Sequence, residues 1–419
     1  MLRLWYHPLR LKVLPFAGAK AVPEGWIFNV RKKTGKVQSM MAEKTYTFPG
    51  FIDVHVHFRD PGVPEAETMA SGLKAAFRGG FAAVVTMPNT TPAGDSVEWI
   101  QGQVSGSGFQ VSGSTPLIFP SACITKGRLG REVADLETLA DAGAAFFTDD
   151  GSYVADDKVM EEAMRRAADL NRVICQHAMD PVELRGGVIR DCPLAKKLGL
   201  PVISVETETK AIRRDLSLVR ETGCRLHVQH ISTAEGVALV RDAQSEGLPV
   251  TAEATPHHLL LSCDDLVADD ANFKMAPPLG NHEDRAELRK AVKDGVLMFA
   301  TDHAPHPAAK KSLGFAKSAN GIIGLETAIP ITYAVMVEEE GMSVEKWAEA
   351  WWKMPRDIVS GFRFQVSGSK FQGVGCKLRD TVVTVGGGRV VDVDAFASLS
   401  RNCPYAGMTF RCWPVAARD

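Results

Sequence analysis

Short apolar runs alternate with amphipathic stretches along most of the chain. Each run ends in polar or turn residues, and the runs lie at residues 51–57, 81–87, 116–122, 143–149, 172–177, 225–230, 248–254 and 295–302. Between them, stretches such as 67–80 and 156–171 carry apolar residues at three-to-four spacing, which predicts helices. Eight strand–helix units predict a parallel sheet closed into a TIM-like (β/α)8 barrel, an α/β fold. The alternative, a doubly wound open sheet, would carry a glycine fingerprint after its first strand, and none is present.

The two ends of the chain depart from this alternation. Residues 1–48 are irregular and rich in turn signals, whereas residues 362–419 hold short β-like runs. In the second segment the three glycines at 386–388 separate DTVVTV from GRVVDV, which predicts a hairpin turn. We therefore expect a small β-sandwich domain composed of both ends, beside a catalytic barrel of residues 49–361.

Composition and charge exclude several classes of protein. The 419 residues are 45% hydrophobic and carry a formal net charge of −2, so the chain has no basic field to attract nucleic acid or an anionic membrane. No apolar run approaches the roughly 20 residues of a membrane span, and charged residues interrupt the apolar N-terminus, so we expect no signal peptide. The 8 cysteines are scattered without a C-x-x-C pair, which is typical of reduced thiols in a cytoplasmic protein.

The first apolar run, FIDVHVH, ends in two histidines that are two residues apart. Residues two apart on a strand face the same way, so Asp53, His55 and His57 are expected on one face, and Val54 and Val56 on the other. Two imidazoles at the C-terminal end of a barrel strand can bind one metal ion. A pair of hydrogen-bonded core histidines is the structural alternative.

Polar residues also end four of the other predicted strands: Asp149 and Asp150 end the fourth, His177 the fifth, His230 the sixth, and Asp302, His303 and His306 the eighth. In a barrel these ends meet at one mouth, where active sites lie. Four histidines and two carboxylates are enough for two divalent metals that share a bridging carboxylate. Each residue alone has a structural explanation, but their common placement favours a metal site.

The motifs at the strand ends resemble those of the dihydroorotases, a family of the amidohydrolase superfamily. The similarity runs in order through roughly residues 49–330 and resumes at SRNCPYAGMTF (400–410). It rests on HVHFRDPG (55–62), MPNT (87–90), FTDDG (147–151), TPHHL (255–259), TDHAPH (301–306) and GIIGLETA (321–328).

This resemblance implies one or two Zn²⁺ ions in the mouth of the barrel. The implied ligands are His55, His57, Asp150, His177, His230 and Asp302. The H-x-H pair and Asp302 would hold the more buried ion, and the other two histidines the second. Many relatives bridge the ions with a carboxylated lysine, but the fourth run ends FFTDDG without one. An aspartate takes that place in one bacterial branch, so Asp150 is the bridging candidate and Asp149 the close alternative.

The resemblance also implies the reaction, the reversible hydrolysis of L-dihydroorotate to N-carbamoyl-L-aspartate in de novo pyrimidine biosynthesis. A metal-activated water would attack the ring amide, and Asp302 would carry its proton to the leaving nitrogen. Arg59 would pair with the substrate carboxylate, which Asn89 and His306 would also contact. We expect a homodimer, and no special role for His227.

Two residues differ from the family motif and leave alternative functions open. FKMAPPLGN (273–281) has Ala276 and Gly280 where the family has the asparagine and arginine of K-x-N-P-P-L-R, and loss of the asparagine removes a hydrogen bond worth about 1 kcal/mol. Another cyclic-amide hydrolase, such as an allantoinase or hydantoinase, is one alternative, although those families lack the counterpart of Arg59. A non-catalytic partner of aspartate transcarbamoylase is the other, although such proteins lose metal ligands. Association with that enzyme alongside catalysis stays open.

Overall fold

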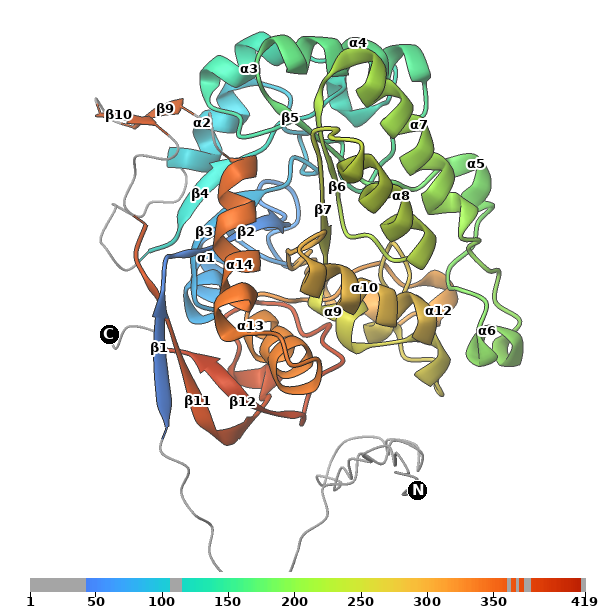
Figure 1. Cartoon of the computed structure of the whole chain (residues 1–419), viewed down its shortest axis with the longest axis vertical. Helices are drawn as coiled ribbons and strands as arrows, with labels where there is room; N and C mark the ends of the chain where they lie inside the picture. Colours follow the sequence, from blue (N-terminus) through green and yellow to red (C-terminus); the bar gives the residue numbers. More distant parts are fainter. Residues whose placement is uncertain (1–42, 106–114, 360–362, 367–368, 373–377, 416–419) are drawn as a thin grey trace, which may run out of the picture.

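A ring of parallel strands forms the centre of the computed structural model, which describes residues 43–105, 115–359, 363–366, 369–372 and 378–415 (Figure 1). The ring contains two parallel sheets, ordered β2–β3–β4 and β5–β6–β7–β8. Their strands are β2 (Phe51–Val56), β3 (Phe81–Thr86), β4 (Leu117–Pro120), β5 (Val173–Gln176), β6 (Arg225–Val228), β7 (Val250–Ala254) and β8 (Met298–Phe299).

Isolated backbone bridges join the two sheets into a closed ring. Phe147 pairs in parallel with Ala122 beyond β4 and with Ile174 of β5, so the fourth predicted strand is reduced to this bridge. On the opposite side, Val56 of β2 pairs in parallel with His303 beyond β8. The predicted apolar runs therefore occupy successive positions around the ring, and the prediction of a (β/α)8 barrel is confirmed.

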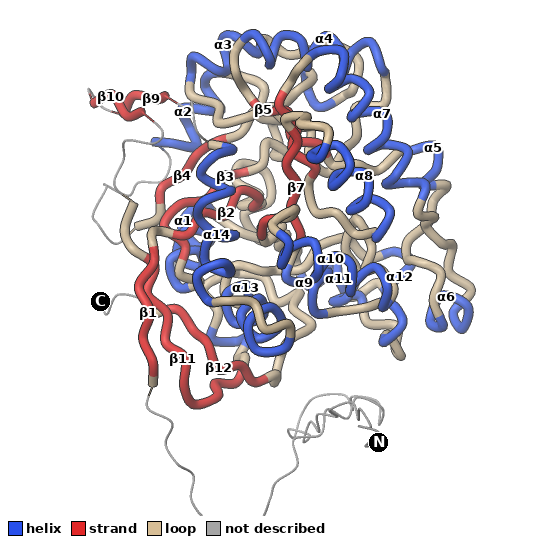
Figure 2. The backbone as a smooth tube through the Cα atoms, viewed as in Figure 1, coloured by secondary structure: helices blue, strands red, loops and turns tan. Residues whose placement is uncertain are grey.

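Helices surround the ring, as the blue segments of Figure 2 show. The α-helices are α1 (Met69–Arg78), α2 (Val97–Ser105), α3 (Leu136–Ala142), α4 (Asp157–Asp169), α5 (Pro181–Leu184), α6 (Pro193–Leu198), α7 (Glu206–Thr222), α8 (Ala234–Ser245), α9 (Pro256–Leu260), α10 (His282–Asp294), α11 (Ala308–Lys311), α12 (Gly314–Lys317), α13 (Ala328–Thr332) and α14 (Val344–Ile358). Shorter helical turns are η1 (Lys126–Arg128), η2 (Cys263–Asp265), η3 (Ala271–Phe273) and η5 (Val393–Ala395), and η4 (Tyr333–Glu339) is a π-helix.

Helix α4 shows why the predicted amphipathic stretches fold as they do. Its buried residues are Met160, Ala163, Met164 and Ala167, which recur at the spacing of one helix face. The helix begins after Asp156, whose carboxylate accepts hydrogen bonds from two backbone amides of the first turn. Such a cap contributes about 1 kcal/mol and fixes where the helix starts.

Alternate residues of a barrel strand pack into two different hydrophobic clusters. On β3, Ala83 and Val85 belong to a smaller cluster of strand residues, whereas Val84 belongs to the larger cluster that contains the buried helix faces. On β2 the alternation fails, because Val54 and Val56 lie in different clusters. The expectation that they share a face is wrong. The β2–β3 pairing shifts register between Asp53 and Val56, and this irregularity reorients the histidine-bearing end of the strand.

A separate antiparallel sheet contains strands from both ends of the described chain. β1 (Lys44–Phe48) pairs with β11 (Thr381–Val390), which pairs with β12 (Thr409–Pro414). Figure 1 shows the blue β1 beside β11 and β12 from the red end of the sequence. Of the predicted β sandwich, the described residues form this three-stranded sheet, while β9 (Arg363–Val366) and β10 (Ser369–Gln372) form a separate hairpin.

The prediction of a hairpin turn at residues 386–388 is wrong. These glycines lie inside the single strand β11, at a register shift between Val385 and Arg389. A Cβ at Gly386 would lie 2.6 Å from Cγ of Glu43, and a Cβ at Gly388 would lie 2.5 Å from Cγ2 of Thr409. The glycines therefore permit close approach of neighbouring strands at a bulge, a role that looks like a turn in the local sequence.

We propose the division of the chain that the sequence predicts, with residues 1–48 and 362–419 in the small β domain. Strand β1 ends at Phe48, just before Phe51 begins the barrel, and residues 1–42 lie outside the described part.

The cysteines of the described residues are buried and free, as expected, and Cys376 lies outside them. Within the described residues, no helix has both the length and the apolar character that crossing a membrane requires.

Candidate metal centre

The two histidines of the H-x-H motif converge with Asp302 at the C-terminal end of the barrel. Nε2 of His57 lies 3.0 Å from Oδ1 of Asp302, and Nε2 of His55 lies 3.5 Å from the same oxygen. All three side chains are buried, and their ligand atoms lie within 4.8 Å of one another. The structure thus brings together residues that are more than 240 positions apart in the sequence.

Asp150 lies between all four candidate histidines. Its Oδ1 is 3.2 Å from Nε2 of His55 and 3.6 Å from both Nδ1 of His177 and Nε2 of His230. Its Oδ2 is 3.3 Å from Nε2 of His57. None of the contacts to Oδ1 has hydrogen-bond geometry, although this oxygen is buried. A buried carboxylate that divides its oxygens among four imidazoles fits a ligand shared by two cations.

His177 and His230 complete the second half of the cluster. Their facing nitrogens, Nδ1 and Nε2, are 2.8 Å apart, and the rings are perpendicular. His55, Asp150 and His230 also form a group whose ligand atoms lie within 4.8 Å of one another. All six predicted ligands therefore lie together: the two groups share His55, and His177 joins them through its contacts with Asp150 and His230.

Burial opposes charge at Asp150, Asp302, His55 and His177. It would raise the pKa of Asp150, but the neighbouring His55 and His57 hold that pKa well below its usual value. Burial likewise opposes ionisation of Asp302, whose pKa His55 and His57 keep low. Burial lowers the pKa of His177, whereas neighbouring carboxylates, Asp150 first, raise the pKa of His55 well above its usual value despite its burial. Imidazole nitrogens combined with carboxylate oxygens are a donor set that suits a divalent ion such as Zn²⁺.

Asp149, the alternative to Asp150, is occupied elsewhere. Its Oδ1 accepts hydrogen bonds from the backbone amides of Ile124, at 2.9 Å, and Thr125, at 3.1 Å. Its Oδ2 accepts a hydrogen bond from the Thr125 hydroxyl. Asp149 is therefore bound to the loop after β4, and Asp150 is the member of the pair that faces the histidines.

The three predicted substrate-binding residues lie around the cluster. The half-buried Arg59 has a left-handed backbone, with φ of 57°, and its Nε donates to the carbonyl of Pro305 at 3.4 Å. It forms no ion pair with a described residue, and although burial lowers its pKa to about 10, it stays cationic near neutrality. The ring of His306 contacts the carbonyl of Asn320 at 2.7 Å through Nε2.

Asn89 makes a contact that the sequence does not predict. Its Oδ1 lies 2.9 Å from Nδ1 of His57. A hydrogen bond from Nδ1–H would leave Nε2 of His57 free to face Asp150 and Asp302. Asn89 therefore orients a candidate ligand, in addition to the substrate contact expected for it.

Glu253 and His227 are functional candidates that the sequence pattern does not single out. Glu253 lies on β7, and its Oε1 is 2.6 Å from Nδ1 of His55. Nε2 of His227 is 2.9 Å from Oε2 of the same carboxylate. The available signal was a single glutamate near the end of the apolar run 248–254.

Gly280, where the family has an arginine, lies in a position without space for a side chain. A Cβ there would lie 2.5 Å from Cβ of Asp284 and 2.7 Å from the carbonyl oxygen of Ser232. Asp284 accepts from the Asn281 amide in the capping box of α10, so this crowding is built into the start of a helix. The departure at Gly280 thus belongs to the local packing and leaves the six candidate ligands unchanged.

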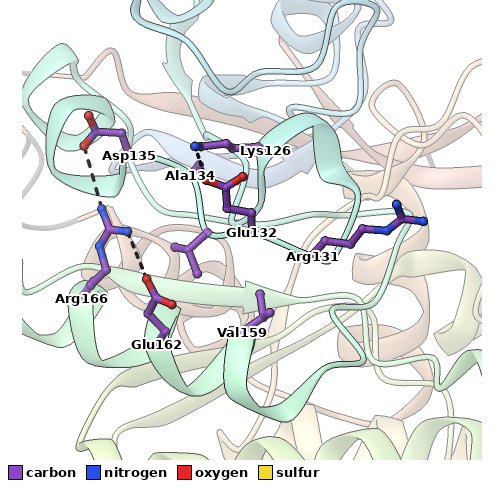
Figure 3. A pocket seen from close by; sticks show the side chains of 9 residues that line it. Lys126, Arg131, Glu132, Ala134, Asp135, Val159, Glu162 and Arg166 are labelled. Carbon is purple, nitrogen blue, oxygen red and sulfur yellow. Dashed lines mark hydrogen bonds and ion pairs between the residues drawn. The ribbon is translucent and has the colours of Figure 1, made fainter.

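A surface hollow of about 330 Å³ lies away from this cluster, between the segment 126–135 and α4 (Figure 3). Most of its charged side chains pair with one another, Lys126 with Glu132, and Arg166 with Asp135 and Glu162. No predicted metal ligand lines it. We therefore place the candidate active centre at the strand ends and not in this hollow.

Comparisons with known proteins place the chain in a family. A family model described as "Dihydro-orotase-like" matches residues 45–236. A dihydroorotase of Anoxybacillus flavithermus is 39% identical over 374 residues, which cover 88% of this chain and 85% of that protein. A dihydroorotase of Bacillus subtilis is 38% identical over 372 residues, covering 88% and 84%.

Solved structures show the same architecture. The L-hydantoinase (dihydropyrimidinase) from Arthrobacter aurescens superposes with a TM-score of 0.75 at 25% identity, covering 88% of this chain and 83% of that one. A D-hydantoinase (dihydropyrimidinase) from Thermus sp. has a TM-score of 0.71 at 21% identity, covering 88% and 82%, and supports the fold alone. The curated relatives match most of the chain at a much higher identity, and the chain therefore belongs to the dihydroorotase family.

Proposed function

We propose that this chain is a zinc-dependent dihydroorotase that interconverts L-dihydroorotate and N-carbamoyl-L-aspartate in pyrimidine biosynthesis. The observation that carries the proposal is the position of Asp150 between four histidines, at the end of a barrel whose curated relatives are named dihydroorotase. Within this proposal, one or two Zn²⁺ ions are held by His55, His57, Asp150, His177, His230 and Asp302.

The residues of the cluster have two roles, to hold the metal and to transfer a proton. When bound, the metal would polarise the ring amide carbonyl and activate a water molecule. Asp302 lies in contact with both histidines of the H-x-H pair, and its lowered pKa keeps it ionised and able to accept a proton. Asp302 takes a proton from the attacking water as the water oxygen bonds to the carbonyl carbon, and delivers this proton to the ring nitrogen as the carbon–nitrogen bond breaks. Ring closure is the reverse sequence.

Removal of metal is the first test of this proposal. A chelator is expected to abolish turnover of L-dihydroorotate, followed by the loss of its ultraviolet absorbance, and added Zn²⁺ is expected to restore it. Turnover that survives complete metal removal, verified by elemental analysis, would contradict the role given to the cluster. A hydantoin and allantoin serve as comparison substrates, and preference for either by the zinc-loaded protein would overturn the substrate but not the metal site.

Arg59 is proposed to bind the substrate carboxylate through its guanidinium. Arg59→Lys is expected to raise KM for dihydroorotate by about 10- to 100-fold with a smaller change in kcat, since a hydrogen bond to a charged group contributes about 1.5–3 kcal/mol. Arg185→Lys is the matched control, because Arg185 also has a left-handed backbone, with φ of 48°, but is exposed and paired with Glu183. Equal KM values for the two variants would remove Arg59 from the substrate site.

The remaining parts of the proposal concern partners and location. We propose a homodimer in the cytoplasm that acts on a small molecule and binds neither nucleic acid nor membrane. The low net charge supports the last two points. Association with aspartate transcarbamoylase stays a prediction, which co-elution of the two proteins from a sizing column would test.

A further inference from the structure

Glu253 is a fully buried carboxylate that contacts two of the candidate metal ligands. It accepts from Nδ1 of His55 at 2.6 Å, from the backbone amide of His230 at 3.2 Å, and from Nε2 of His227 at 2.9 Å. Glu253 therefore lies inside the barrel in direct contact with His55 and His230 of the candidate metal cluster.

The 2.6 Å contact with Oε1 of Glu253 occupies Nδ1 of His55 and leaves Nε2 as the ring nitrogen that faces the cluster. Nε2 is the atom that lies 3.2 Å from Asp150 and 3.5 Å from Asp302. The carboxylate of Glu253 thus holds the His55 ring in the orientation in which Nε2 faces the centre.

His227 contacts Glu253 on the side away from the metal cluster. His227 donates from Nε2 to Glu253, and its Nδ1 lies 2.9 Å from the Thr251 hydroxyl. His227 and Thr251 are adjacent partners in the β6–β7 ladder, so the far end of this line is anchored in the sheet. Rigid neighbouring strands therefore hold Glu253 at a fixed distance from His55.

We propose that Glu253 is a positioning residue for the metal centre, which orients His55 through Nδ1 and fixes the backbone of His230. The inference rests on the proposed function, because it assumes that these histidines bind metal. Carboxylates behind a ligating histidine raise its basicity and lock its ring, and their loss weakens metal binding by about 10- to 100-fold.

Glu208 offers a matched control within the same barrel. It is also buried, at 2% exposure, and its carboxylate accepts from the amide and hydroxyl groups of Ser232 and Thr233. Glu208 contacts no histidine in these interactions. Replacing either glutamate with glutamine removes one buried charge, but only the change at Glu253 alters a candidate metal ligand.

The test compares zinc affinity in the wild-type chain, Glu253→Gln and Glu208→Gln, measured by competition with a chromophoric chelator. Glu253→Gln is expected to weaken zinc binding by about 10- to 100-fold, whereas Glu208→Gln is expected to stay within about threefold of wild type. Equal affinities in Glu253→Gln and wild type would overturn the inference and leave the proposed function intact. A wild-type chain that binds no zinc would overturn the proposed metal site, and the inference with it.

A second pair of variants tests the positioning role of Glu253 if the glutamine variants do not fold. Glu253→Asp keeps the charge but withdraws the carboxylate by one methylene group, and Glu208→Asp makes the same change at the control position. We expect Glu253→Asp to weaken zinc binding by less than Glu253→Gln does, but by more than Glu208→Asp. Equal zinc affinities in the two aspartate variants would contradict a positioning role, because a purely structural role predicts a change in thermal stability alone.

Discussion

Replacement of Asp302 by asparagine is expected to lower kcat for L-dihydroorotate by about 10²- to 10⁴-fold, the range typical of a lost general acid–base group. Asparagine has nearly the same shape but cannot take up a proton or supply a charged oxygen to His55 and His57. Asp302 has a left-handed backbone, with φ of 47°, which asparagine also tolerates. The substitution therefore changes the chemistry of the side chain with little backbone strain.

The measurement is steady-state turnover in both directions, with zinc content determined on the same samples. Asp215→Asn is a suitable control, because Asp215 is also buried but pairs with Arg214 on α7 and forms no ion pair with a candidate ligand. This control is expected to lose stability and keep its turnover per zinc-loaded molecule. An Asp302→Asn protein with more than about a tenth of wild-type kcat would exclude the proton-transfer role.

The barrel could be predicted because its signal is local and repeated. A buried parallel strand has to be an apolar run, and a crossover helix has to be amphipathic, so each unit carries its own pattern. The fourth run, 143–149, nevertheless forms only a bridge at Phe147. Its apolar residues are buried as expected, but backbone pairing depends on neighbouring strands and on the turn that begins at Asp149, which no local pattern reports.

At the three glycines 386–388, by contrast, the local sequence pattern predicts the wrong structure. Their local pattern is that of a hairpin, yet β11 continues through them because β12 pairs with it on both sides of the glycines. The partner comes from residues 409–414, so contacts distant in sequence determine whether the glycines form a turn or a bulge. A single glycine run cannot distinguish these two outcomes.

The candidate site could be predicted where its residues end strands, and not where they support other residues. His55, His177 and His230 follow apolar runs, and the geometry of a barrel gathers such positions at one mouth. Glu253 lies within its strand, and its partner His55 is 198 residues away. Nothing near Glu253 in the sequence reports that partner, so its contact with a candidate ligand appears only in three dimensions.

The two neighbouring aspartates at the end of the fourth run should respond differently to replacement by asparagine: zinc binding should fall for Asp150, and stability for Asp149. Asp150→Asn is expected to reduce zinc affinity by on the order of 100-fold or more and to abolish most turnover. Loss of a ligand should weaken binding at least as much as loss of a residue that only supports a ligand. Asp150 contacts four histidines, and an asparagine Nδ2 would present hydrogens to one side of that cluster. Zinc stoichiometry and kcat on the same preparation measure both effects.

Asp149→Asn is the paired experiment, because it makes the same chemical change one residue away. The buried carboxylate of Asp149 accepts from two backbone amides and the Thr125 hydroxyl, so loss of this set is expected to cost about 1–3 kcal/mol of unfolding free energy. Zinc affinity is expected to change little, because Asp149 faces the loop after β4. If Asp149→Asn lost zinc and Asp150→Asn kept it, the bridging role would pass to Asp149. The fourth strand end would then have to rotate from the arrangement in which Asp150 faces the histidines.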